Sequence, residues 1–311
     1  MENKKIPLIC VVGPTASGKT SLGIELAKAF NGEIVSADSM QIYKGIPIAS
    51  AVATNDEMQG IPHHLLEFLK LEQSFSVADY VNLAKNKIID IYSRGKQPIL
   101  VGGTGLYVNS LVDGITFLEE KSDEEVLEGL KKELKDKGAE YMLQKLAEID
   151  PENAAKLHPN NTRRILRSLE IFFTTGKTKT EQDKCSKENG TIFDTVMIGI
   201  TYENREKLYE RINRRVDIML RNGLLEEAKS TLKLTKGVGA AQAIGHKELH
   251  KFLLGEATLD EVVENLKRET RRYAKRQLTW FRRREDINWV YADKENVLEK
   301  ASEIIRKGRY I

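Results

Sequence analysis

The sequence contains little cysteine, because only Cys10 and Cys185 occur among its 311 residues. Cys10 lies in an apolar run and Cys185 in a polar stretch, so the pair suggests neither a disulfide framework nor a zinc site. Long apolar runs are missing as well, and none approaches the ~20 residues that a helix needs to cross a bilayer. The first residues show no cleavage-site pattern, so we expect no signal peptide. These absences favour a cytoplasmic protein without a membrane span.

The composition is that of an ordinary globular protein, with 41% hydrophobic and 31% charged residues. The formal net charge of +3 hides an asymmetry along the chain. The segment 267–284 carries nine Lys or Arg residues and one acid, Glu269, so the rest of the chain is net acidic. Such a concentration of positive charge predicts a surface that binds a polyanion rather than charge spread for solubility.

Short apolar runs alternate with segments of helical periodicity in the first part of the chain. Helices are expected over 21–30 and after the capping-box pattern at Ser76. Strands are expected at 8–12, 33–37, 98–101, 195–200 and 287–291. Strands that alternate with helices predict an α/β fold with a parallel sheet flanked by helices.

The composition changes near residue 116, where the chain becomes rich in Glu and Lys. Helical periodicity covers 119–150 and 161–174, and a polar loop is expected over 175–191. We therefore expect an all-helical insertion at 116–192, set into a core formed by 1–115 and 193–311. Beyond residue 204 the core is expected to be helical, with a long helix that starts near Thr258 and runs into the basic segment.

The clearest motif is Gly13-Pro14-Thr15-Ala16-Ser17-Gly18-Lys19-Thr20, which fits G-x-x-x-x-G-K-[ST] at each fixed position. A predicted strand precedes it and a predicted helix follows, which is the context that the motif requires. Its glycines let backbone amides converge on an anion, and the helix N-terminus adds partial positive charge. Lys19 supplies a full charge, and the Thr20 hydroxyl is placed to hold Mg²⁺. The motif predicts a di- or triphosphate site without deciding between them.

Asp38 follows the second predicted strand. The carboxyl ends of parallel strands face the ligand crevice, so Asp38 should lie across from the phosphate loop. A nucleotide hydrolase of this class needs an acid after another core strand, but the segment 102–104 offers none. Asp38 is therefore either a base for an incoming nucleophile or a common turn aspartate.

Arg211 and Arg215 lie four residues apart, so they share one face of a predicted helix. They are either a phosphate clamp or part of an exposed charged face. The pair His63-His64 has no carboxylate partner at metal-binding spacing, which indicates a structural or substrate-adjacent role.

Aromatic residues are interleaved with the charges of the segment 267–284. Tyr273, Trp280 and Phe281 offer stacking surfaces for unpaired bases, and the basic residues offer phosphate contacts. A smaller basic cluster at Arg163, Arg164 and Arg167 lies on the expected insertion. Most charge runs are solvated faces, but this combination favours a nucleic-acid partner.

Taken together, the motifs resemble those of the bacterial tRNA dimethylallyltransferases, also called tRNA isopentenylpyrophosphate transferases. The resemblance covers nearly the whole chain and depends on eight stretches: 13–20, Ser36-Ala-Asp-Ser-Met-Gln-Ile-Tyr-Lys-Gly45, Pro62-His-His-Leu65, Phe75-Ser-Val-Ala-Asp79, Val101-Gly-Gly-Thr-Gly-Leu-Tyr107, His158-Pro-Asn160, Ala241-Gln-Ala-Ile-Gly245 and Lys275-Arg-Gln-Leu-Thr-Trp280.

The resemblance implies transfer of a dimethylallyl group from dimethylallyl diphosphate to N6 of an adenine next to the anticodon of tRNA. The implied partners are the tRNA anticodon stem-loop and the donor, dimethylallyl diphosphate. The implied cofactor is Mg²⁺, held at Thr20. The protein is expected to be a monomer. The implied catalytic residues are Asp38 as general base, Thr104 and Arg215. The implied diphosphate-binding residues are Gly13, Thr15, Ala16, Ser17, Gly18, Lys19, Thr20 and Arg211.

The implied tRNA contacts come from several separate stretches. They are Asp38, Ser39, Met40, Gln41, Thr104, Pro159, Asn160, Asn161, Thr162, Arg163, Gln242, Ala243, Ile244, Gly245, His246, Lys247, Arg272, Arg276 and Trp280. The chain departs from the family's common pattern at His246, where Tyr is frequent, and at Leu127, where Arg is frequent. Both departures concern single tRNA contacts rather than the reaction.

Three other functions compete with this one. A small-molecule kinase would use the same loop for ATP and Asp38 to activate a hydroxyl, and a related isopentenyltransferase would act on free adenine nucleotides. Neither enzyme has to hold a large polyanion, so the basic segment and the insertion disfavour both. A non-catalytic RNA-binding protein would leave the intact phosphate loop unexplained.

Overall fold

The computed structural model describes residues 5–117, 123–186, 190–233, 240 and 243–308. The chain divides into two compact units. Unit 1 comprises Met1–Val112 and Ile192–Ile311, and unit 2 comprises Asp113–Thr191. The boundaries expected from composition, 116 and 192, lie within three residues of this division.

Unit 1 is built on a parallel sheet, which confirms the expected fold class. In the described residues the sheet has six strands in the order β3-β2-β4-β1-β5-β6. The strands are β1 (Ile6–Val12), β2 (Gly32–Ser36), β3 (His63–His64), β4 (Gln97–Gly102), β5 (Phe193–Thr201) and β6 (Ile287–Tyr291). The centres of β1, β2, β4 and β5 are apolar and buried, as a sheet covered on both faces requires.

The register brings the carboxyl ends of the central strands to one edge. Val12 at the end of β1 pairs with Gly102 of β4 on one side and with Gly199 of β5 on the other. Ser36 at the end of β2 pairs with Val101 of β4. The segments that follow β1, β2 and β4 therefore start side by side at this edge.

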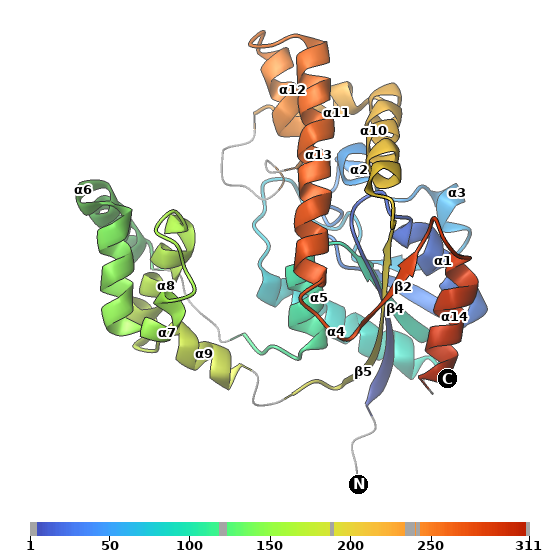
Figure 1. Ribbon diagram of the computed structural model, residues 1–311, viewed down its shortest axis with the longest axis horizontal. Helices are drawn as coiled ribbons and strands as arrows, with labels where there is room; N and C mark the ends of the chain where they lie inside the picture. The colour runs from blue at the N-terminus through green and yellow to red at the C-terminus, as the bar shows by residue number, and fades with distance from the viewer. Residues whose placement is uncertain (1–4, 118–122, 187–189, 234–239, 241–242, 309–311) are drawn as a thin grey trace. The chain divides into compact units, whose positions relative to one another are not determined.

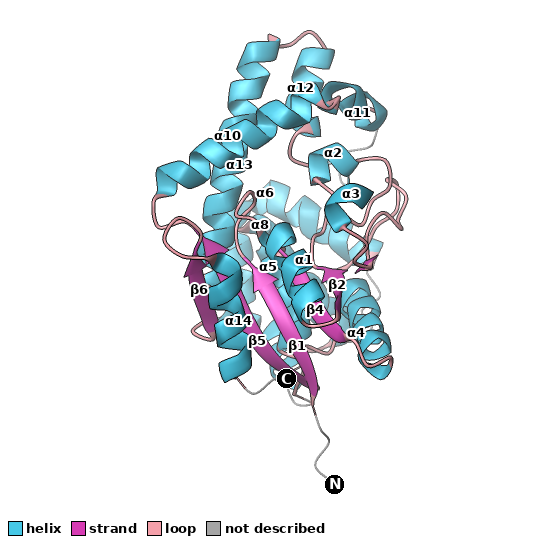
Figure 2. Cartoon of the chain, turned by 90° about the vertical axis from the view of Figure 1, so that its right-hand side faces the viewer, coloured by secondary structure: helices cyan, strands magenta, loops and turns pink. Residues whose placement is uncertain are grey.

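Two helices cover one face of the sheet, and Figure 2 shows them in front of the strands. They are α1 (Lys19–Ala29) and α14 (Val297–Lys307), which contact each other as well as the sheet. Leu22 and Leu26 of α1 and Ile305 of α14 pack with strand residues in one buried cluster. The helices α4 (Val77–Ser93) and α5 (Gly105–Val112) contact each other and β4. The expected capping box at Ser76 and Asp79 starts α4.

A helical group continues unit 1 beyond β5 (Figure 1). It contains α10 (Arg205–Arg221), α11 (Leu224–Thr231), α12 (His246–Leu253) and α13 (Leu259–Phe281). Val216, Leu224, Leu249 and Leu266 form its buried cluster. The short helices α2 (Pro47–Ser50) and α3 (Asn55–Met58) follow β2, and α2 contacts α11.

Unit 2 is all-helical in its described residues. It contains α6 (Glu124–Ile149), α7 (Pro151–Ala154), α8 (Thr162–Thr175) and α9 (Lys179–Cys185). Leu130, Met142, Ile165 and Leu169 form its core. The expectation of a polar loop over 175–191 was wrong, because a capping box between Thr178 and Glu181 starts α9 within it.

The pair His63-His64 forms the edge strand β3. His64 Nε2 lies 2.7 Å from Glu33 Oε2, and Arg94 Nη1 donates to Glu33 Oε1 at 2.5 Å. The Arg94 guanidinium, and to a lesser degree His64, lower the pKa of Glu33 to about 2 against the effect of burial. His64 is thus part of a polar cluster with Glu33 and Arg94 at the edge of the sheet, which supports the structural interpretation of the pair.

Candidate active site

The phosphate loop between β1 and α1 is a compact turn that depends on its backbone conformation. Gly13 has φ +144°, Gly18 has φ +102° and Ala16 has φ +62°, so three loop residues occupy the left-handed half of conformational space. A Cβ on Gly13 would lie 2.3 Å from the carbonyl oxygen of Ile200 in β5, so no side chain fits there. The loop leads into the N-terminus of α1, the arrangement that binds phosphate groups.

Lys19 lies under the loop as the first residue of α1. Its Nζ donates to the carbonyl oxygen of Pro14 at 2.7 Å, which holds the ammonium against the loop. Desolvation lowers the pKa of Lys19 to about 7, the charge of Arg215 adds to this effect, and Asp38 opposes it. A bound anion would reverse the shift, because it stabilises the charged ammonium. The Lys19 ammonium is thus placed where it can bind a phosphate group.

Ser17 and Thr20 contribute hydroxyl groups at the loop. The Ser17 Oγ is buried and has no hydrogen-bond partner among the described residues. Thr20 is exposed in the first turn of α1. Buried hydroxyls normally have a partner, so the Ser17 Oγ is suited to bind a polar ligand at the loop.

The two arginines of α10 lie at the same site but act differently. Arg211 Nε donates to the carbonyl oxygen of Ala16 at 3.0 Å, and its guanidinium carbon lies 5.5 Å from the centroid of the Tyr202 ring. Arg211 therefore supports the backbone of the phosphate loop. Arg215 lines the adjacent cavity, and burial lowers its pKa while the charges of Asp38 and Glu57 raise it. A buried guanidinium beside a phosphate loop favours anion binding.

Asp38 and Thr104 follow β2 and β4. One Asp38 oxygen, Oδ1, accepts a hydrogen bond from the backbone N–H of Met40 at 2.9 Å, which is the turn role. The Asp38 side chain also lines the cavity. Thr104 Oγ1 accepts from the backbone N–H of Ser39 at 3.0 Å and donates to Ser39 Oγ at 3.3 Å. The turn role uses one carboxylate oxygen and is therefore compatible with the base role expected from the sequence.

A cavity of about 290 Å³ in unit 1 brings these groups together. Its polar lining includes Thr15 of the phosphate loop, Asp38 and Arg215. Its other lining residues are Ser39, Met40, Ala49, Ser50, Val216, Met219, Ala243, Ile244, Gly245, Lys247, Leu266, Thr270, Tyr273 and Arg276. The lining thus combines charged and polar groups with apolar side chains such as Met40, Val216 and Leu266, as a ligand with a charged head and an apolar tail requires.

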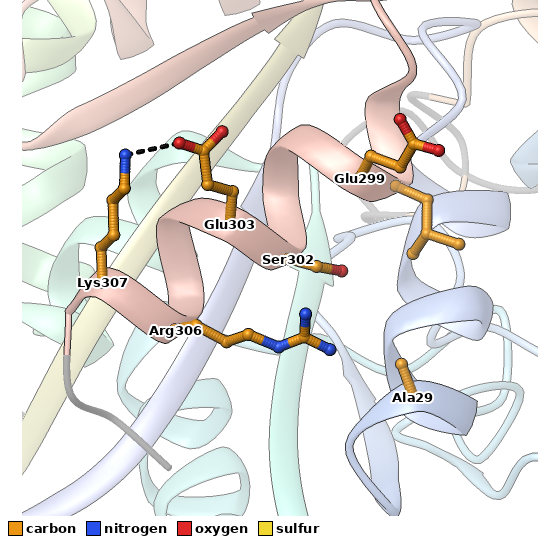
Figure 3. A pocket seen from close by; sticks show the side chains of 7 residues that line it. Ala29, Glu299, Ser302, Glu303, Arg306 and Lys307 are labelled. Atoms are coloured by element: carbon orange, nitrogen blue, oxygen red, sulfur yellow. Dashed lines mark hydrogen bonds and ion pairs between the residues drawn. The ribbon is translucent and has the colours of Figure 1, made fainter.

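A hollow of about 640 Å³ lies elsewhere, between the C-terminal part of α1 and α14 (Figure 3). Its charged side chains include Glu303 and Lys307, which form an ion pair with each other. None of its lining residues comes from the phosphate loop or from the strand ends. We assign no chemistry to it.

His246 does not have the exposure expected for a tRNA contact. Its side chain is 0% exposed, and its ring nitrogens lie 2.8 Å from Glu227 Oε1 and 3.0 Å from Thr231 Oγ1. Glu227 also accepts the backbone N–H groups of Ile48 at 2.7 Å and Ala49 at 2.8 Å. His246 therefore supports the wall of the cavity through Glu227 and α2, a role that we did not expect from the sequence.

The other expected tRNA contacts differ in exposure. Within the basic segment, Arg272 and Arg276 are exposed, Trp280 is half-buried, and Phe281 is fully buried in the core rather than available for stacking. In unit 2, Asn160, Asn161 and Arg163 are exposed, whereas Pro159 and Thr162 are partly buried. In the segment before α12, Ala243 and Gly245 are buried, Ile244 is partly buried and Lys247 is exposed. Gln242 lies outside the described residues.

The chain is similar to known proteins over most of its length. A family model described as IPP transferase matches residues 41–284. The chain belongs to the IPP transferase family. The tRNA dimethylallyltransferase of Bacillus subtilis is 50% identical over 290 residues, which cover 93% of this chain and 92% of that protein. The enzyme of the same name from Caldanaerobacter subterraneus subsp. tengcongensis is 48% identical, with 96% of each chain covered.

Solved structures of such enzymes share the fold. The full-length tRNA isopentenylpyrophosphate transferase of Bacillus halodurans has a TM-score of 0.70 at 43% identity, with 98% of this chain and 97% of that chain covered. A eukaryotic dimethylallyltransferase acting on tRNA has a TM-score of 0.82 at 32% identity, with 96% of this chain and 78% of that chain covered. The resemblance inferred from the motifs is thereby confirmed.

Proposed function

We propose that this protein transfers a dimethylallyl group from dimethylallyl diphosphate to N6 of an adenine next to the anticodon of tRNA, and releases diphosphate. The observation that carries the proposal is a cavity that is lined by Thr15 of the phosphate loop, by Asp38 and Arg215, and by several apolar side chains. The relatives named tRNA dimethylallyltransferase support the reaction class. A phosphate loop next to a cavity with many apolar lining residues suits an allylic diphosphate better than a nucleoside triphosphate.

The donor's diphosphate binds at the loop Gly13–Thr20, and its dimethylallyl group extends along the apolar wall. An adenine amino group is a weak nucleophile because its lone pair is delocalised into the ring. The carbon–oxygen bond of the donor must therefore loosen first, and negative charge develops on the leaving diphosphate. The loop amides, Lys19 and Arg215 stabilise that charge as it forms.

The Thr20 hydroxyl is suited to hold Mg²⁺ once a diphosphate is bound. The described residues contain no cluster of three His, Cys, Asp or Glu side chains that would form a protein cage for a metal. Mg²⁺ at phosphate sites takes few protein ligands and completes its shell with substrate oxygens and water, so this residue set fits. The ion would neutralise diphosphate charge in this site.

Asp38 accepts a proton from N6 as the new bond forms between N6 and the allylic carbon. The oxygen that is not bound to Met40 N–H is available for this step. Thr104, tied to Ser39, positions the adenine next to Asp38. Because a stacked base cannot enter such a cavity, the target nucleotide is turned out of the anticodon loop.

The RNA contacts come from both units. In unit 1, Arg272 and Arg276 on α13 bind phosphate groups of the RNA. In unit 2, the segment Pro159–Arg163 at the start of α8 contacts the RNA, so that the helical insertion serves as a clamp. We further propose that the protein acts as a monomer and, because tRNA is its substrate, in the cytoplasm. No described helix is long and apolar enough to span a membrane.

The proposal is tested by mixing the protein with Mg²⁺, unmodified tRNA and labelled dimethylallyl diphosphate, in parallel with labelled ATP. Label recovered in tRNA as N6-substituted adenosine supports it, whereas phosphate transfer from ATP alone indicates a kinase. Repeating the assay with free adenine nucleotides at several salt concentrations separates the remaining alternative. Activity on tRNA should fall steeply with salt, because phosphate contacts release counterions.

A further inference from the structure

Gln277 is a buried polar residue on the inner face of α13. It is 5% exposed and belongs to a buried row whose other members are Val262, Leu266, Thr270, Ala274 and Phe281. Burying an amide is unfavourable unless its oxygen and nitrogen are hydrogen-bonded. The hydrogen-bond partners of the Gln277 amide therefore indicate its structural role.

Both ends of the Gln277 amide bind segments of the candidate active site. The carbonyl oxygen accepts a hydrogen bond from the backbone N–H of Thr15 at 2.8 Å, and Nε2 donates to the carbonyl oxygen of Gly103 at 2.9 Å. Thr15 belongs to the phosphate loop after β1, and Gly103 follows β4 directly before Thr104. One side chain thus joins the segment that holds the donor to the segment that positions the acceptor.

Glycine at position 103 leaves the room that this contact occupies. A Cβ there would lie 2.3 Å from Gln277 Nε2, although the φ of Gly103 lies outside the left-handed region. Gly105 repeats the pattern, because its Cβ would lie 2.2 Å from Trp280 Cδ1. The helix α13 therefore docks tightly on the segment 103–105, and the position of Gln277 is closely fixed.

We propose that Gln277 is a positioning residue that sets the separation between the allylic carbon of the donor and the N6 of the acceptor. The proposal rests on the proposed function. Its side chain lies outside the set of residues that line the cavity, so it acts through Thr15 and Gly103 rather than on the substrates. Reacting atoms held by different loops must be aligned, and a displacement of ~1 Å costs a rate factor of roughly 100.

Three variants at this position disrupt its two bonds in different ways. Gln277→Met keeps the length of the side chain and removes both bonds. Gln277→Glu can still accept from Thr15 but cannot donate to Gly103 as a carboxylate. Gln277→Asn keeps both groups on a shorter chain. We expect kcat to fall by roughly 10- to 100-fold in all three, with the KM of each substrate within about threefold of the original.

Two further variants make the test independent of Gln277 itself. Gly103→Ala would displace the amide from the opposite side and should reproduce the loss of kcat. Thr279→Ala is the matched control on the same helix, because Thr279 is exposed and its hydroxyl donates to the carbonyl oxygen of Lys275 one turn earlier in α13. Thr279→Ala should leave kcat unchanged.

Product analysis distinguishes misalignment from a general loss of structure. Water can attack the same allylic carbon, lose a proton to solvent and give dimethylallyl alcohol and diphosphate. Misalignment of N6 should raise the ratio of this alcohol to modified tRNA, whereas a smaller folded fraction would lower both products equally. An unchanged ratio, or a kcat within twofold of the original in Gln277→Glu and Gly103→Ala, would overturn the proposal. If the unaltered protein transfers no dimethylallyl group, the proposed function itself fails instead.

Discussion

Lys19 and Arg215 are two cations that face the same phosphate loop from different helices, and the charge of Arg215 helps to lower the pKa of Lys19 to about 7. Two positive groups thus lie close enough to repel each other, and a bound anion would relieve that repulsion. Asp38 counteracts this repulsion, because its negative charge raises the pKa of both Lys19 and Arg215. The relationship leads to a prediction about donor binding.

Donor affinity should decrease as the pH rises above about 7. Lys19 loses its proton in the free enzyme over this range, and diphosphate binding must then restore it, so the KM of the donor should rise by up to about tenfold per pH unit. Steady-state kinetics at saturating tRNA between pH 6.5 and 9 would measure this. Lys19→Arg, whose side chain stays charged, should lose the pH dependence while binding the donor less well. A flat profile in the unaltered protein would contradict the prediction.

Asp38→Asn separates the two roles of Asp38. The asparagine oxygen can still accept from the Met40 N–H, but the amide cannot accept the N6 proton. We expect kcat to fall by roughly 10²- to 10⁴-fold, with tRNA affinity unchanged in a filter-binding assay. Asp38→Ala also loses the turn and should be no more active. Near-normal turnover in Asp38→Asn would remove Asp38 from the role of base.

Glu227→Ala should destabilise the wall of the cavity, although Glu227 does not line the cavity itself. The change leaves the N–H groups of Ile48 and Ala49 and the buried His246 without their shared acceptor, which should cost about 2–3 kcal/mol of unfolding free energy. Chemical denaturation would measure the loss of unfolding free energy, and a higher KM for tRNA would report the effect on the cavity. Its neighbour Glu226 is exposed and pairs with Lys229, so Glu226→Ala is the control and should change neither. Equal effects of the two substitutions would refute the supporting role.

Glu33→Gln should lower stability in a pH-dependent way. The folded-state pKa of Glu33 is lowered to about 2 from the ordinary glutamate value of 4.5, so its ion pairs stabilise the fold above pH ~4.5 and lose that effect as the pH falls towards 2. Because the partner Arg94 is partly exposed, we expect a loss of only about 2 kcal/mol at pH 7. Urea denaturation at pH 7 and pH 3 would test this, with exposed Glu72→Gln as a neutral control. A deficit that is the same at both pH values would argue against the ion pairs.

The sequence predicted the elements whose signals are local. The phosphate loop, the strand that precedes it and the capping box at Ser76 each depend on a few adjacent residues. The helix α9 was missed although the capping pattern of Thr178 and Glu181 is visible in the sequence, because the segment is polar throughout. The helix α14 and the two-residue strand β3 were also not expected.

The positioning contacts of the site could not be predicted. Gln277 and Thr15 are 262 residues apart, and Glu227 and Ile48 are 179 residues apart. No periodicity identifies such partners, because the packing of whole helices brings them together. Family resemblance placed His246 in a tRNA-contacting stretch, but only the structure showed that its side chain is buried. A glutamine among the apolar positions of a helical row is the one sequence signal that could have drawn attention to Gln277.

The most direct test of the central claim is a crystal structure of the protein with diphosphate, Mg²⁺ and an anticodon stem-loop that contains the target adenine. We expect the diphosphate at the loop Gly13–Thr20, and the adenine N6 within hydrogen-bonding distance of Asp38 and close to the apolar wall of the cavity. Diphosphate bound elsewhere, or an adenine held away from Asp38, would contradict the proposed reaction at this site.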